Sequence, residues 1–395
     1  MISQIGHTEY SIHLSHWHKE FWFLAIANSL LSIGVYMLIP EMLTYMRING
    51  FSYQAQALVM GAYVLGLYAF GPFVSYLVER YRRKRVCQYA ILLLIGDILM
   101  MLYLRTSPMA ARFELVVALR FILGAVYGLA QMVLLSTLVV DSVQSYFRTE
   151  ANYHINWFGR LAVALGPLIS LVVVSHVSLE RAFLLSVLLS VLALLLISVI
   201  RFPFKTPPDN IERCSLDRFL LPGGVMLFVC LALIMVVVGM LYTLRLPAAF
   251  FAWMLLGLFV AVLVERIAFV NAELKSQAVT ALLAMIIALF LLIERSGCHE
   301  VISISATLLG LGVGVIGTRF LLFFIKLSTH CQRGTSQSSY FLSWETGIGL
   351  GVVGGLAVCH GEMYLTLWIA LAISIMACML YVFYLHRWFM KHKNR

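Results

Sequence analysis

Six ionisable side chains lie inside long apolar stretches of this sequence, namely Asp97, Arg120, Asp141, Arg160, Arg319 and Glu345. A charge at the centre of a lipid-exposed helix costs about 2.5–3.5 kcal/mol on insertion scales. Each of these groups is therefore expected to face a partner or a water-filled cavity. Their depth within the stretches gives three hypothetical pairs: Asp97 with Arg120, Asp141 with Arg160, and Arg319 with Glu345.

Asp97 is the acidic residue placed deepest in the middle of an apolar stretch. Burial favours the neutral form of a carboxyl group, whereas a nearby guanidinium such as that of Arg120 favours the charged form. A carboxylate for which a proton, a solute and an arginine compete could carry protons. A purely structural pair of Asp97 with Arg120 is an equally good interpretation, and both hypotheses are kept.

A second polar pattern surrounds Arg120. Arg120, Gly124, Tyr127 and Gln131 are spaced by four, three and four residues, which places them on one helix face. Asn28 adds an amide from the first apolar stretch. We expect Asn28, Arg120, Tyr127 and Gln131 to line a cavity for a solute. The alternative is that they make hydrogen bonds between helices and hold a bundle together.

The elements that position these residues must be membrane helices. The chain is 62% hydrophobic, only 12% charged and has a mean hydropathy of +0.94, which is too apolar for a water-soluble domain of 395 residues. The apolar runs have helical length and no strand-like alternation. We place twelve spans at about 20–40, 53–79, 85–104, 113–142, 152–175, 181–200, 219–243, 247–265, 276–293, 300–326, 339–359 and 363–385.

The basic residues predict the orientation of this bundle. One set of loops and termini holds 19 Lys and Arg residues and the other holds 6, so the richer side and both termini are expected in the cytoplasm. We expect an integral protein of the bacterial inner membrane. The same placement explains the net charge of +10 without a nucleic-acid partner. Seven scattered cysteines indicate neither a disulfide framework nor a zinc site, and we expect no metal and no cofactor.

The chain also repeats itself. Gly71–Arg80 and Gly257–Arg266 share the pattern G-x-F-V-x-x-L-V-E-R at a displacement of 186 residues. The polar segment 201–217 contains three of the nine prolines and separates six spans from six. We therefore predict two pseudo-symmetric six-helix halves, residues 1–200 and 218–395, joined by a cytoplasmic linker at 201–217, with a solute site between the halves.

Four motifs resemble those of the major facilitator superfamily. Ser75, Glu79, Arg80, Arg82, Arg83 and Lys84 occupy the places of its loop signature G-x-x-x-D-R-x-G-R-K, and Arg120 and Gly124 are similar to its R-x-x-Q-G pattern. Gly166-Pro167 resembles its antiporter motif, and RGTSQSSYFLSWETGIGLGVVGG resembles a segment of the drug- and arabinose-efflux-like branch.

The resemblance implies roles for several residues. It implies a twelve-helix fold with a cavity lined by spans 1, 4, 7 and 10. It also implies a cytoplasmic gate in which Glu79, near Arg80, faces the start of span 11 and Arg83 reaches Asp141. Arg160, Arg319 and Glu345 are assigned to the same charge network. Topology alone would also explain the basic cluster. Gly166 and Pro167 are expected to bend span 5 or to let a neighbouring helix approach closely.

These observations favour a secondary active transporter rather than an enzyme. We expect a monomer that moves a small hydrophobic or amphiphilic solute by alternating access, with protons as the coupling ion and efflux as the direction. An uptake permease for a small metabolite is the alternative within transport. A non-transporting receptor or a lipid-acting enzyme is disfavoured, the latter because the sequence holds no H-x-x-x-H or G-x-S-x-G motif and no phosphate-binding loop.

Overall fold

The computed structural model describes residues 19–106, 112–143, 148–202, 211–295 and 297–394, apart from the side chains of Thr106, Asp141 and His330. All regular structure in these ranges is helical, which confirms the all-α prediction. The helices are α2 (Lys19–Ile48), α3 (Tyr53–Ala69), α4 (Val74–Arg80), α5 (Arg83–Thr106), α6 (Phe113–Val133), α7 (Val139–Ser142), α8 (Arg148–Arg160), α9 (Ala162–His176), α10 (Leu179–Val199), α11 (Val225–Tyr242), α12 (Ala248–Ile267), α13 (Leu274–Glu294), α14 (His299–Leu327), α15 (Arg333–Ala357), α16 (Met363–Met379) and α17 (His386–His392).

Eleven helical segments of the described residues are long and apolar enough to cross a membrane. The one predicted span that is not among these segments is the eleventh, α15, whose 25 residues extend over about 37 Å at 1.5 Å per residue. It is long enough to cross about 30 Å of hydrocarbon. It differs from the other spans because the residues that it buries are largely polar or small, including Gln337, Ser339 and Glu345. A helix of this kind must face protein rather than lipid.

The first span is longer than the sequence predicted. Instead of ending at Pro40, α2 continues through this proline to Ile48. A proline inside a helix removes one backbone hydrogen bond, but packed neighbours can hold such a helix together in a membrane. The extension places Glu41 inside the bundle, where its side chain is fully buried.

Small residues set the closest helix crossings. A Cβ atom added to Gly124 in α6 would lie 2.1 Å from the carbonyl oxygen of Tyr63 in α3. A Cβ atom added to Gly310 in α14 would lie 2.0 Å from the carbonyl oxygen of Met254 in α12. Only glycine allows the two backbones to approach so closely. Gly124 and Gly310 are separated by the repeat displacement of 186 residues, so the repeat places the same small residue at equivalent crossings.

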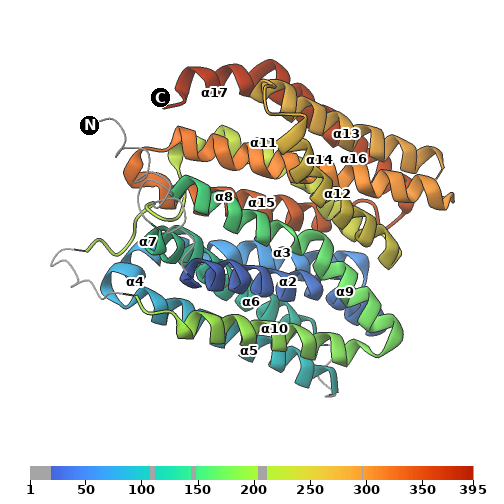
Figure 1. Cartoon of the computed structure of the whole chain (residues 1–395). Coiled ribbons are helices and arrows are strands. Elements are labelled where there is room, and N and C mark those ends of the chain that lie inside the picture. Colours follow the sequence, from blue (N-terminus) through green and yellow to red (C-terminus); the bar gives the residue numbers. More distant parts are fainter. Residues whose placement is uncertain (1–18, 107–111, 144–147, 203–210, 296, 395) are drawn as a thin grey trace.

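Helices from the beginning and the end of the chain pack together along a seam. We call α2 to α10 the first helix group and α11 to α17 the second. Figure 1 shows the blue-to-green first group below and the yellow-to-red second group above. Across the seam, α3 packs against α15, and α9 packs against α12. Figure 1 also places α4, α7 and α17 at one end of the bundle, which we call the linker end. The opposite end is the far end.

Several spans contain an interruption, and two of these interruptions border the seam. The fifth span is interrupted at Leu161, between α8 and α9, and Pro167 lies in the second turn of α9. The fourth span continues from α6 into α7 through a π-helical turn at Leu134–Leu138. Such irregular turns free backbone groups and re-aim side chains, and both lie beside the seam.

Candidate functional site: a polar and aromatic pocket at the seam

A pocket lies between the two helix groups. Its wall comes from α2, α6 with the π-helical turn, α8 and α15. The lining residues are Asn28, Ser32, Tyr36, Tyr127, Gln131, Leu135, Asn156, Gly159, Arg160, Tyr340, Phe341, Trp344 and Glu345. Amides, hydroxyl groups and aromatic rings dominate this wall, together with one carboxyl group and one guanidinium. The composition is that of a site for a small molecule.

Three of the four predicted cavity residues line this pocket, namely Asn28, Tyr127 and Gln131. The Nε2 atom of Gln131 donates to Ser32 Oγ at 3.1 Å, and the Tyr127 hydroxyl donates to the same atom at 3.4 Å. The stripe on the fourth span thus lines the cavity and also joins helices, so the two hypotheses are not exclusive. The lining comes from spans 1, 4, 5 and 11 of the chain, in place of the expected set of 1, 4, 7 and 10.

Arg120, the fourth predicted cavity residue, is fully buried but lies outside the pocket lining. Its guanidinium carbon lies 5.2 Å from the centre of the Tyr63 ring, and its Nη2 atom donates to the sulfur of Met60 at 3.4 Å. A cation over an aromatic face is stabilised by the ring quadrupole. Arg120 is therefore held by α3, the helix that packs on α6 through Gly124.

The predicted direct pair of Asp97 with Arg120 is not formed. Both carboxylate oxygens of Asp97 are buried and have no hydrogen-bond partner among the described residues. Asp97 is also not the most buried acid, because Glu41 is 0% exposed and its two oxygens likewise have no described hydrogen-bond partner. The sequence analysis missed Glu41 because it ended the first span at Pro40. The signal that could have found it is that a membrane helix tolerates proline, so the apolar run continues.

Glu345 is bound to the first helix group, and the predicted pair of Arg319 with Glu345 is wrong. One carboxylate oxygen of Glu345 accepts a hydrogen bond from Tyr36 at 2.8 Å, and the other accepts from Tyr63 at 3.0 Å. Arg319 instead forms an ion pair with Glu265 at 3.4 Å. Depth alone could not reveal this arrangement, because Arg319 and Glu345 have the same depth but face different neighbours.

Arg160 binds the second helix group. Its Nη1 atom donates to the carbonyl oxygen of Gly314 at 2.9 Å and to the hydroxyl of Thr318 at 2.6 Å. Its Nε atom donates to the carbonyl oxygen of Asn156 at 3.2 Å. The Nη2 atom is buried and has no described hydrogen-bond partner. The predicted partner, the Asp141 carboxylate, lies outside the described residues.

Tyr153 joins the two groups a short distance toward the linker end. Its hydroxyl donates to Glu265 Oε2 at 2.7 Å, the carboxylate that also pairs with Arg319. Nearby, Asn156 Nδ2 donates to Gln337 Oε1 of α15 at 2.7 Å. Both contacts close the pocket toward the linker end. The sequence analysis did not assign Tyr153, Asn156 or Gln337 a role, since amides and tyrosines inside spans are common for packing reasons.

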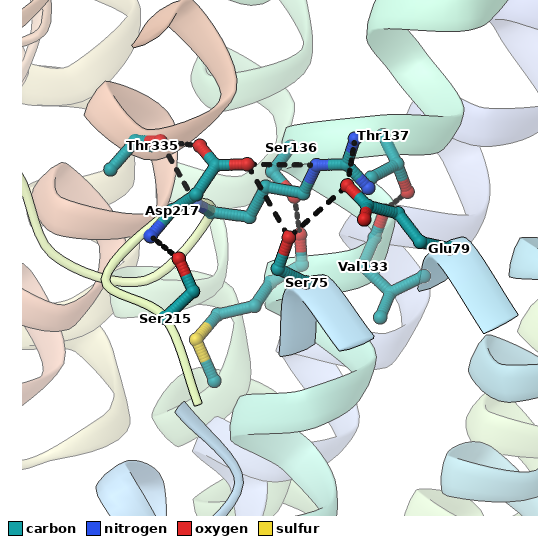
Figure 2. A network of polar contacts seen from close by, with 10 residues as sticks. Ser75, Glu79, Val133, Ser136, Thr137, Ser215, Asp217 and Thr335 are labelled. Atoms are coloured by element: carbon teal, nitrogen blue, oxygen red, sulfur yellow. Dashed lines mark hydrogen bonds and ion pairs between the residues drawn. The ribbon is translucent and has the colours of Figure 1, made fainter. Parts of the chain in front are cut away.

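The charged residues of the predicted loop signature lie at the linker end, but their partners differ from those that the resemblance implied. Glu79 pairs with Arg218 at 3.5 Å. The start of α15 is held by Asp217 rather than Glu79, because the Thr335 hydroxyl donates to Asp217 Oδ1 at 2.7 Å. Figure 2 shows the Asp217 carboxylate between Thr335 and Ser75. Ser75 donates to both Glu79 and Asp217, at 3.3 and 3.5 Å.

The remaining predicted gate residues lie beside this cluster. Arg80 is exposed to solvent and Arg83 is partly buried at the start of α5. The contact expected between Arg83 and Asp141 involves a side chain outside the described residues. Asp217 and Arg218 were not predicted as gate residues, because Asp217 was assigned to the linker and Arg218 to the first position of the second half, outside any motif.

Gly166 and Pro167 act through their backbones. A Cβ atom added to Gly166 would lie 2.5 Å from Tyr36 Cβ and 2.9 Å from the Tyr36 carbonyl carbon, so α2 and α9 approach closely at the height of the pocket. Pro167 lacks an N–H group and cannot donate to the carbonyl oxygen of Val163. The Tyr242 hydroxyl of α11 donates to this oxygen at 2.6 Å instead. The proline thereby provides an acceptor for the second helix group.

The chain was compared with protein families, with curated proteins and with solved structures. A family model described as the Major Facilitator Superfamily matches residues 24–264. A comparison with curated proteins gave no match. A crystal structure of a mutant of the nucleoside transporter NupG superposes with a TM-score of 0.65 at 13% sequence identity, covering 95% of this chain and 100% of that chain.

Two further solved structures have similar scores. An autoinhibited POT family peptide transporter has a TM-score of 0.66 at 12% identity and covers 93% of this chain and 97% of that chain. The POT family transporter PepTSo has a TM-score of 0.66 at 11% identity and covers 96% of this chain and 100% of that chain. At these identities the likeness establishes the fold and carries no information on the solute.

Proposed function

The chain belongs to the major facilitator superfamily, and we propose that it exports a small amphiphilic solute by alternating access, in exchange for protons. Membership supports a secondary transporter of the membrane, and it favours transport over an enzymatic activity. Family membership does not determine the solute class, the direction of transport or the coupling ion, so these three are our proposal. The main observation that supports them is the pocket between the two helix groups.

An amphiphilic solute fits the chemistry of the pocket wall. The rings of Tyr127, Phe341 and Trp344 offer apolar and aromatic contact. Amides and charged groups on the same wall offer hydrogen bonds. A purely apolar solute would leave these buried polar groups without partners, which costs free energy. A polar solute without an apolar part would make no apolar contact with the rings of Tyr127, Phe341 and Trp344.

Alternating access fits the contacts on both sides of the pocket. Toward the linker end, Asn156 and Gln337 bridge the groups. Toward the far end, Arg47 Nη2 donates to the carbonyl oxygen of Thr243 in the second group at 3.3 Å. One set must break for a solute to enter, while the other stays closed. Rocking of two packed helix groups around a central site is the motion that such a fold permits.

Proton exchange is supported by Glu345. Its carboxyl group lies on the pocket wall and accepts hydrogen bonds from two neutral hydroxyl groups. It can therefore take up a proton without leaving a partner cation unpaired. A solute that competes with this proton would couple the two flows. Asp97, which lies away from the pocket lining, is a second candidate for the proton path.

We further propose that the linker end faces the cytoplasm of a bacterial cell and that the protein works as a monomer in the inner membrane. The asymmetry of 19 against 6 basic residues supports this orientation. The motifs at Gly166-Pro167 and in α15 support the drug- and arabinose-efflux-like branch and hence efflux.

The proposal is tested by flux in proteoliposomes. Purified protein is reconstituted with a pH-sensitive dye inside the vesicles. A panel of lipophilic cations, amino acids, dipeptides and sugars is then added under an imposed pH gradient. We expect at least one amphiphilic solute to move protons through the wild type and to lose this effect in Glu345→Gln. Glu300→Gln, at an exposed position at the start of α14, is the matched control and should behave as wild type.

Two results would contradict the proposal. If no solute of the panel crosses the membrane through the wild type, transport itself is refuted and a receptor becomes the better hypothesis. If a solute crosses but Glu345→Gln couples its movement to protons as well as the wild type does, Glu345 is not the coupling group. In that case Asp97→Asn is compared in the same assay.

A further inference from the structure

Two opposite charges line the same pocket and do not neutralise one another. Glu345 and Arg160 both belong to its wall. Each is at least 95% buried, with exposed fractions of 4%. Among the described residues no ion pair joins them, because Glu345 is bound to α2 and α3 while Arg160 is bound to α14. Buried charges that face one cavity without a counter-charge are unfavourable unless something else supplies it.

The Arg160 side of the pocket is a site for an oxygen anion. Three acceptors fix the guanidinium in place through Nε and Nη1. They leave the buried Nη2 atom without a described partner, and the buried Tyr340 hydroxyl has none either. Both groups line the pocket and both can donate. A carboxylate is an oxygen anion that can accept from a guanidinium and a hydroxyl together.

The Glu345 side is a site for a cation. Both donors to its carboxylate, Tyr36 and Tyr63, are neutral. The other buried arginines that could neutralise it are engaged elsewhere, Arg120 over the Tyr63 ring and Arg319 with Glu265. The Tyr127 and Phe341 rings, whose centres are 5.7 Å apart, lie on the same wall. A carboxylate among aromatic rings is the setting in which proteins bind ammonium groups.

From these two sides we infer that the pocket takes a zwitterionic solute, with an ammonium group at Glu345 and a carboxylate at Arg160. This inference rests on the proposed transport function and names its substrate class. A solute that carries only one charge would neutralise one side and leave the other buried and uncompensated. The aromatic wall between the two sides would contact the body of the solute. An aromatic amino acid or a small dipeptide with an aromatic side chain has a body that suits such a wall.

The test is a binding experiment on the full chain purified in detergent, because binding can be measured whether or not transport occurs. The probes are L-phenylalanine and the dipeptide glycyl-phenylalanine. Each is compared with its C-terminal amide, a cation, with its N-acetyl derivative, an anion, and with the doubly blocked neutral form. We expect the wild type to bind at least one zwitterion at least tenfold more tightly than each of its blocked forms, as read from thermal shift and Trp fluorescence.

Charge variants give the decisive readout. Arg160→Gln should reverse the preference, so that the amide cation binds more tightly than the zwitterion. Glu345→Gln should favour the N-acetyl anion in the same way. This reversal also shows that each variant is folded, since an unfolded variant would bind none of the probes. Arg181→Gln, at an exposed position, should keep the wild-type preference.

The inference is overturned if neither zwitterion binds at 10 mM, or if a singly charged or neutral form binds the wild type as tightly as its zwitterion. It is also overturned if both charge variants keep the wild-type order. Failure of the transport proposal looks different. In that case the zwitterion binds with the expected preference, but neither it nor any other solute crosses the vesicle membrane.

Discussion

Glu345 of α15 links the second helix group to two helices of the first. Its carboxylate accepts hydrogen bonds from Tyr36 of α2 and from Tyr63 of α3. Its two oxygens are each used once. The loss of either donor would leave a buried carboxylate oxygen without a partner. Such a loss costs about 1–3 kcal/mol in a protein interior.

We therefore predict that Tyr36→Phe lowers the thermal stability of the detergent-solubilised protein by an amount equivalent to about 1–3 kcal/mol, because the phenyl ring keeps the packing but not the hydroxyl. Tyr63→Phe should have a similar effect while it preserves the ring beneath Arg120. Tyr89→Phe is the control, since Tyr89 is 62% exposed. The prediction is wrong if all three variants melt together with the wild type.

The same residues show what spacing can and cannot reveal. Tyr127 and Gln131 could be placed on one helix face from the sequence because their four-residue spacing fixes that face, whereas Asn28 was proposed only as an amide in the first span. The three charge pairs were assigned by depth alone, and neither pair that the described residues test is formed. A helix of known depth can still rotate about its axis, and the sequence does not record that angle. Glu345 and Arg160 were thus recognised as unusual, but their partners were not.

At the scale of the helix, close backbone contact decides which positions tolerate a side chain. We predict that Gly166→Ala destabilises the protein by about 1–3 kcal/mol, because its Cβ atom would lie 2.9 Å from the backbone of α2 and must push the helices apart. Gly354→Ala is the matched control, since a Cβ atom there meets nothing within 4 Å. Melting temperatures compare the two. Equal values for the two variants would show that α2 can move away without cost.

Pro167 and Tyr242 form a second unit at this scale. Tyr242→Phe removes a hydrogen bond from α11 to the Val163 carbonyl and should cost about 0.5–1.5 kcal/mol. Pro167→Ala restores an N–H group that can satisfy the same carbonyl from within α9. We expect Tyr242→Phe to cost clearly less in the Pro167→Ala background than in the wild type. A double-mutant cycle of melting measurements tests this, and full additivity would contradict it.

The order and number of the spans could be predicted from hydropathy, but the residues at which the helices end could not. The first span was predicted to end at Pro40, but α2 continues through this proline to Ile48. The fifth span is interrupted at Leu161, six residues before Pro167, whereas Gly166 allows the close approach of a neighbouring helix that was the alternative to a bend. Both differences arise because neighbouring helices decide where a membrane helix can bend.

For the whole molecule, the cluster at the linker end is expected to control how often the pocket opens on that side. Glu79 and Arg218 are 30% and 20% exposed in their side chains, so their ion pair is worth about 0.5–1 kcal/mol after solvent screening. We predict that Arg218→Ala raises the fraction of molecules open at the linker end by about two- to fivefold.

This opening can be measured as the rate at which a membrane-impermeant thiol reagent labels Leu135→Cys in a background whose native cysteines are replaced. Leu135 lines the pocket and takes no part in the hydrogen bond between Asn156 and Gln337. Arg213→Ala, an exposed position in the linker, is the control and should leave the rate unchanged. Identical rates for Arg218→Ala and its parent would show that the cluster does not limit opening.

The polarity of α15 has a consequence for how this protein is made. Eleven spans can enter a bilayer on their own composition, whereas α15 carries Gln337, Glu345 and a run of serines that oppose its release into lipid. Its polar face is satisfied by tyrosines from α2 and α3, which are synthesised some three hundred residues earlier. During biogenesis the early helices must already be assembled as a receiving surface when α15 leaves the ribosome. The seam that later serves the solute is then also the template on which the last part of the chain is inserted.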